Sequence, residues 1–123
     1  MNITIKQCFH MEHTIIFQKA YDAYRLLAEL TEFFPKKDRF GIGIRMENTF
    51  LHLLEAIITA ETTIPALKDR ALIEAITQAE ISAVLARLAM ERDLIKETNY
   101  FFFAESFREI AKMTNGWRKS LSR

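Results

Sequence analysis

The hydrophobic positions of the chain repeat with the period of an α-helix in four long stretches. The first carries apolar residues three or four places apart: Ile16, Ala20, Ala23, Leu27, Leu30 and Phe34. This spacing places them on one side of a helix. Because the residue before a proline is pushed out of the helical region, Pro35 predicts that this helix ends there. We therefore expect a helix over residues 13–34, preceded by an arm of residues 1–11 that shows no helical pattern.

The second stretch, residues 36–61, has an apolar face that includes a carboxylate. At about 100° per residue, four large side chains lie within about 40° of Phe40. They are Ile44, Leu51, Leu54 and Ile58, and with Phe40 they form one apolar face. We expect this face to meet the core, and Glu47 lies on it. A buried carboxylate needs a partner, so we expect an ion pair with an arginine of a neighbouring helix. Gly41 and Gly43 each weaken a helix, and a packing reason would compensate, because glycine lets another backbone approach closely.

The third stretch, residues 65–96, is apolar on two sides. One side carries Leu72, Ile76, Ala79, Ala83, Ala86 and Met90. The other carries Ile81, Val84, Leu85 and Leu88. A helix of a lone four-helix bundle buries only one side, so the second face predicts a contact between subunits. A protein that stays monomeric at micromolar concentration would contradict this inference.

The fourth stretch, residues 99–121, separates an apolar face from a basic one. The apolar face consists of Phe103, Phe107, Ile110, Thr114, Trp117 and Leu121. The opposite face carries Arg108, Lys112, Lys119 and Arg123, interrupted by Glu105. This stripe is either a solvated face or a row of phosphate contacts. A helix that ends at Asn115–Gly116 would remove Lys119 and Arg123 from the stripe.

Four helices joined by short links predict an all-α, antiparallel four-helix bundle, with residues 1–123 as a single domain. The aromatic run Tyr100–Phe103 cannot face one core with all its rings, which again indicates self-association. The predicted subunit interface comprises Ile81, Val84, Leu85, Leu88, Phe101 and Phe102.

Composition and charge narrow the class of protein. Half of the 123 residues are apolar, which suffices for the core of one domain. The net charge is only +1, but residues 98–123 hold five basic and two acidic side chains. The single cysteine, Cys8, excludes an internal disulfide and fits a reducing compartment. No apolar run approaches the roughly 20 residues of a membrane-spanning helix, and no signal peptide is apparent. We expect a cytoplasmic protein that does not bind a membrane.

The sequence offers no catalytic or metal-binding motif. His10 and His13 are three residues apart, and we expect them to be surface or capping histidines rather than metal ligands. Di-iron bundles need Glu-x-x-His on two helices, whereas His52 and Glu55 stand in the reverse order and have no duplicate. We therefore expect no enzymatic activity, no metal and no cofactor.

Several short motifs occur in a fixed order along the chain: Phe34–Lys37, Arg39–Phe40, Gly43, Arg45, Glu47–Asn48, Leu53–Glu55, Glu109–Met113 and Asn115–Trp117. In order and spacing they resemble the accessory proteins of diversity-generating retroelements, the accessory variability determinants. The likeness extends from about Phe17 to Leu121. Asn115 replaces a glycine that usually stands there, and the chain is less basic than such proteins. The proteins encoded in ribosomal RNA intervening sequences share this architecture.

The resemblance implies a homopentamer without an active site. It implies binding of the retroelement's reverse transcriptase and of its template RNA or cDNA, in support of mutagenic reverse transcription. The candidate nucleic-acid contacts are Lys36, Lys37, Arg39, Arg108, Lys112, Arg118, Lys119 and Arg123. The alternative is a structural oligomer or protein-interaction module, similar to the ribosomal RNA intervening-sequence proteins, in which these residues form only a solvated rim.

Overall fold

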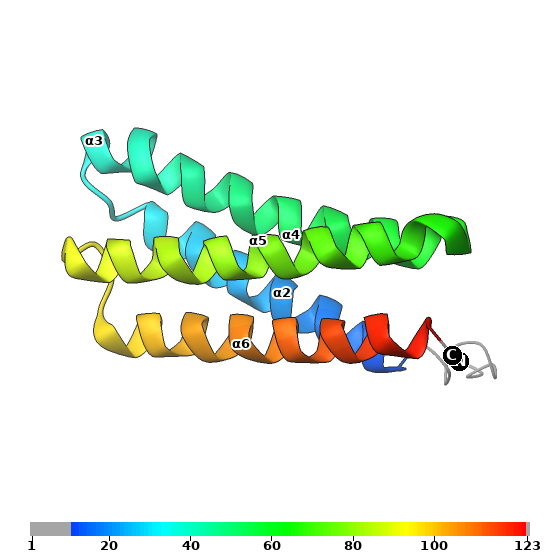
Figure 1. Ribbon diagram of the computed structural model, residues 1–123. Coiled ribbons are helices and arrows are strands. Elements are labelled where there is room, and N and C mark those ends of the chain that lie inside the picture. Colours follow the sequence, from blue (N-terminus) through cyan, green and yellow to red (C-terminus); the bar gives the residue numbers. More distant parts are fainter. Residues whose placement is uncertain (1–10, 123) are drawn as a thin grey trace, which may run out of the picture.

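The computed structural model describes residues 11–122, which form four long antiparallel helices (Figure 1). They are α2 (Met11–Thr31), α4 (Ile44–Thr62), α5 (Pro65–Glu91) and α6 (Glu97–Ser120). Helices α2 and α5 lie diagonally opposite each other, and each packs against both α4 and α6. The predicted all-α four-helix bundle is confirmed. Of the arm expected at residues 1–11, residues 1–10 lie outside the described part of the chain.

The predicted apolar faces of the first and last helices form the core. Helix α2 ends at Thr31 rather than at residue 34, so Phe34 lies beyond it, but all six predicted positions are buried or partly buried. On α6, Phe103, Phe107, Ile110, Thr114 and Trp117 are buried, whereas Leu121 is exposed. At the centre, Phe50 of α4 meets the rings of Phe103 and Phe107 edge-on, with centroid distances of 5.4 and 4.8 Å. This geometry is favourable for aromatic pairs and joins two helices that lie diagonally in the bundle.

The core face predicted for the second helix is wrong. Leu54 is buried, but the other four residues of that face, Phe40, Ile44, Leu51 and Ile58, are exposed. The buried face lies roughly opposite and comprises Met46, Thr49, Phe50, Leu53, Ala56, Ile57 and Ala60. The reason is that this segment carries two apolar stripes, and the stripe that holds Phe50 packs against the aromatic residues of α6.

The predicted partner of Glu47 is also wrong. The hydroxyl of Thr31 donates to Glu47 Oε1 at 2.5 Å, and no arginine of residues 11–122 pairs with this carboxylate. Thr31 is only 3% exposed, so this hydrogen bond joins α2 and α4 inside the bundle. This hydrogen bond satisfies one oxygen of Glu47, whose side chain is partly exposed.

The helix predicted over residues 36–61 contains a π-helical segment. In the structure this stretch is divided into α3 (Lys36–Asp38), the π-helix η1 (Arg39–Gly43) and α4. A Cβ at Gly43 would lie 3.2 Å from the Asp38 carbonyl oxygen and 3.4 Å from the Phe34 ring. Asp38 belongs to the preceding turn of the same helical segment, so Gly43 makes room for the Phe34 ring and not for the backbone of another helix. At Gly41 the expectation is wrong, since a Cβ there would meet nothing within 4 Å.

The third helix ends at Glu91 rather than at residue 96. Asp93 adopts the left-handed conformation, with φ 59°. Its N–H donates to the Met90 carbonyl, and the N–H of Leu94 donates to the Ala89 carbonyl, both at 2.9 Å. This is the Schellman arrangement that terminates helices, with an aspartate where glycine is usual. The sequence offered no glycine to signal it.

Candidate nucleic-acid interface

Three of the predicted nucleic-acid contacts lie together at one end of the bundle. Lys36, Lys37 and Arg39, here called the basic end, stand at the start of the helical segment that leads into α4 (Figure 1). Pro35 precedes them with an extended ψ of 146°, and its carbonyl accepts the Arg39 N–H at 2.8 Å. All three cations are exposed. Within the described part of the chain, none of them has an ion-pair partner.

The acidic residue within this segment is neutralised by another helix. Asp38 Oδ1 accepts from Arg92 Nη2 at 2.8 Å, and Arg92 lies just beyond the end of α5. The Asp38 side chain is only 16% exposed, so this carboxylate is largely withdrawn from the surface. The pair therefore fixes the basic end against α5 and leaves the charges of the three cations directed to solvent.

Arg108, on the outer face of α6, is engaged by a neighbouring carboxylate. Its Nε and Nη2 donate to the two carboxylate oxygens of Glu105, at 3.1 and 2.6 Å. These hydrogen bonds, with help from Glu109, lower the pKa of Glu105 from 4.5 to about 2, and they raise the pKa of Arg108. Any phosphate at Arg108 must compete with Glu105, so Arg108 is a weaker candidate contact than an unpaired cation.

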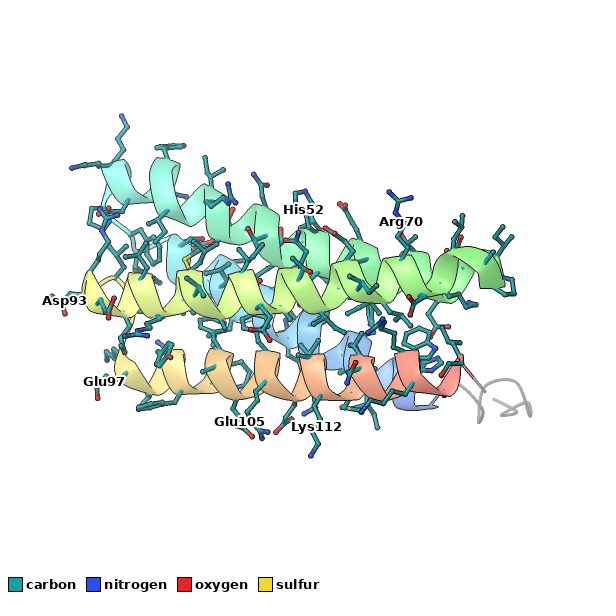
Figure 2. All side chains as sticks on the ribbon, viewed as in Figure 1. His52, Arg70, Asp93, Glu97, Glu105 and Lys112 are labelled. Carbon is teal, nitrogen blue, oxygen red and sulfur yellow. The ribbon has the colours of Figure 1, made fainter. Side chains whose placement is uncertain are left out.

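Lys112 points away from the bundle on the same face of α6 (Figure 2). It borders a pocket of about 510 Å³ between α2 and α6, to which Arg108 and Trp117 also contribute. His13 lies at this pocket with its ring stacked on Trp117, at a centroid distance of 3.5 Å, and its Nδ1 is 2.7 Å from Glu61 Oε1. The expectation of a surface or capping histidine is wrong for His13, whose side chain is 14% exposed. Residue His10 lies outside the described residues.

The last three candidates are at the far end of α6. The helix continues through Asn115–Gly116 to Ser120, so Lys119 stays on it and is exposed. Arg118 is held by Asp69 of α5, with an Nε–Oδ1 distance of 2.7 Å. Arg123 lies outside the described residues.

The predicted contacts do not form one patch on a single chain. The basic end lies at one end of the bundle, Arg108 and Lys112 lie midway along α6, and Arg118 and Lys119 lie at the opposite end (Figure 1). In residues 11–122, no group of three or more histidine, cysteine or acidic side chains could hold a metal ion.

Most of the predicted interface residues are exposed. The relative exposure is 66% for Val84, 41% for Leu88, 61% for Phe101 and 43% for Phe102. Ile81 and Leu85 are half-buried. The sequence reasoning missed a second exposed apolar face, the four residues of the 36–61 segment that were expected in the core. The signal was present in the sequence as the second apolar stripe of that segment.

No protein-family model matches the chain, and no curated protein matches it either. Among solved structures, the chain is similar to a protein of unknown function from the S23 ribosomal protein family of Bacteroides thetaiotaomicron VPI-5482. The TM-score is 0.79 and the identity 17%, over 89% of this chain and 99% of that one. The fold is a four-helix bundle. At this identity the likeness concerns the fold alone.

Within the described helices, none is both long and apolar enough to cross a membrane.

Proposed function

We propose that this protein is a non-enzymatic, self-associating four-helix bundle that binds nucleic acid as an accessory protein of a retroelement. The main support for nucleic-acid binding is the basic end. Its three exposed cations have no carboxylate partner in the described residues, while the neighbouring Asp38 is neutralised by Arg92. Phosphate groups can therefore approach Lys36, Lys37 and Arg39 without displacing an internal ion pair.

The retroelement role rests on the sequence resemblance. By that resemblance the nucleic acid is a template RNA or its cDNA, the partner is a reverse transcriptase, and the assembly is a homopentamer. The separate apolar faces support assembly, because a surface on α4 can meet a different surface on α5 of the next copy. Such head-to-tail contacts close into rings when the rotation between copies permits it. A ring would repeat the basic end several times and increase avidity for a long strand.

The test is binding of a structured RNA across a salt series. Replacing Lys36, Lys37 and Arg39 by alanine should weaken binding and reduce the slope of log K against log salt by about 2, since each phosphate contact contributes about 0.7 to 0.9. The control replaces three exposed arginines elsewhere, Arg25, Arg70 and Arg87, by alanine. This control changes the net charge equally but should retain more of the slope.

The same assay compares two cations of α6. Arg108→Ala should weaken RNA binding less than Lys112→Ala does, because Arg108 is paired with Glu105.

The second candidate is a protein-interaction module or structural oligomer without direct nucleic-acid binding. The exposure of Val84 and Phe101 favours it, because large apolar side chains gain more from a protein contact than from water. Absence of RNA binding even at low salt would favour this candidate and reject direct nucleic-acid binding by the isolated protein.

A further inference from the structure

Two phenylalanine rings stand exposed on either side of the basic end. Phe33 is 85% exposed and Phe40 is 64% exposed. Their neighbour Phe34 is 5% exposed and packs against Gly43. The core therefore accommodates one aromatic ring of this segment and leaves Phe33 and Phe40 outside. Leaving a phenyl ring in water forgoes a substantial gain from burial. A partner molecule that covers Phe33 and Phe40 would therefore gain free energy of binding.

The charges between the two rings indicate the chemical class of this partner. Within residues 33–40, Lys36, Lys37 and Arg39 lie between Phe33 and Phe40 in the sequence. Asp38 is neutralised by Arg92, and Glu32 is the other carboxylate next to this segment in the sequence. Asp93 and Glu97 lie at the same end of the bundle, at the connection between α5 and α6 (Figure 2). A purely apolar partner, including a second copy of an apolar face, would leave three cations without counter-charges. The positive excess favours an anionic partner with flat apolar groups.

The backbone holds these groups in a defined arrangement before anything binds. Phe33 N–H donates to the Leu30 carbonyl at 3.0 Å, and Phe34 N–H donates to the Thr31 carbonyl at 3.2 Å. Pro35 fixes its own φ, and η1 carries Phe40 within a helical segment. Little backbone entropy is then lost when a ligand binds.

We propose that Phe33 and Phe40 stack on unpaired bases of a single-stranded nucleic acid whose phosphates contact Lys36, Lys37 and Arg39. Proteins that bind single strands combine a positive surface with aromatic rings in this way, because each unpaired base offers a face for stacking. A duplex hides those faces and retains only the phosphate contacts. The inference rests on the proposed nucleic-acid binding and adds the form of the nucleic acid and the residues that recognise its bases.

The test compares a labelled single-stranded oligonucleotide with its duplex, using the full chain with Phe33→Leu, Phe40→Leu and the two matching tryptophan variants. Leucine keeps the apolar surface but cannot stack, so each leucine variant should lose about tenfold in affinity for the single strand. The salt dependence of binding should stay unchanged, because no charge is removed. Each tryptophan variant should retain the affinity, and the fluorescence of the new tryptophan should be quenched by the bound strand.

Tyr21→Leu is the matched control. Tyr21 is 42% exposed near the middle of α2, outside the predicted subunit interface and the basic end, so this variant should bind both ligands like the unchanged protein. Thermal unfolding should show that none of these exposed substitutions impairs folding.

The outcomes separate this inference from the proposed function. If the unchanged protein binds the single strand and the leucine variants bind it equally well, base stacking is rejected while nucleic-acid binding stands. If the leucine substitutions weaken binding of the single strand and of the duplex equally, the rings make another contact and the inference is wrong. The inference is also wrong if the tryptophan variants do not retain the affinity of the unchanged protein for the single strand. If the unchanged protein binds neither ligand at low salt, the proposed function fails together with the inference.

Discussion

The hydroxyl of Thr31 and the carboxylate of Glu47 show how a single polar pair joins two helices of this bundle. The Thr31→Val variant keeps the shape of the side chain but leaves Glu47 Oε1 without its donor. We expect a loss of about 1 to 3 kcal/mol in the free energy of unfolding, measured in urea. Thr62→Val is the control, because the exposed Thr62 hydroxyl bonds only to the Ile58 carbonyl of its own helix. Equal effects of the two substitutions would show that the Thr31–Glu47 bond contributes little.

Glu105 provides a prediction that depends on pH. Arg108 lowers its pKa from 4.5 to about 2, so the pair favours the folded state above pH 4.5 and this contribution disappears as the pH falls towards 2. Both side chains are exposed, so the effect on stability is small and is screened by salt. A titration of the side-chain carboxyl carbons by NMR should place Glu105 well below its ordinary range. Arg108→Ala should move the midpoint back up, whereas Arg87→Ala should leave it unchanged.

At the scale of helices, two glycines in helical conformation behave differently. A Cβ at Gly116 of α6 would meet nothing within 4 Å, so Gly116→Ala should stabilise the protein by about 0.5 to 1 kcal/mol through helix propensity. At Gly43 the same Cβ would lie 3.2 Å from a backbone carbonyl that cannot easily move. Gly43→Ala should therefore bring no gain. Thermal unfolding of the two variants tests both predictions, and an equal gain in stability from the two substitutions would contradict them.

The helices themselves were predictable from the sequence, but their faces were predictable only in part. On α2 and α6 one apolar stripe stands opposite polar residues, and the expected residues are buried. The 36–61 segment has two stripes, and periodicity cannot tell which of them contains the ring that fits against Phe103 and Phe107. Likewise, Asp93 in a left-handed conformation ends α5 without a residue that signals it. The cations of the candidate site were visible in the sequence, but the pairing of Arg108 and Arg118 and the isolation of the basic end required tertiary structure.

At the scale of the whole molecule, the exposed apolar residues predict self-association. Val84→Glu should shift the protein to smaller species in sedimentation velocity at micromolar concentration, because a charge would be buried in the subunit contact. Ala66→Glu is the control, an exposed position in the first turn of the same helix. If the unchanged protein is already monomeric at this concentration, the predicted interface does not exist.

The π-helical segment η1 has a consequence for how this protein can change in evolution. A π-turn is equivalent to one extra residue inserted into an α-helix. Loss of Gly41, whose position has free space around it, would let the widened turn return to the α-helical repeat, so Lys36–Asp38 would keep their direction relative to α4. The pairing of Asp38 with Arg92 and the core residues of α4 would keep their places. The segment can therefore be shortened by one residue at this point without redirecting the basic end or altering the core.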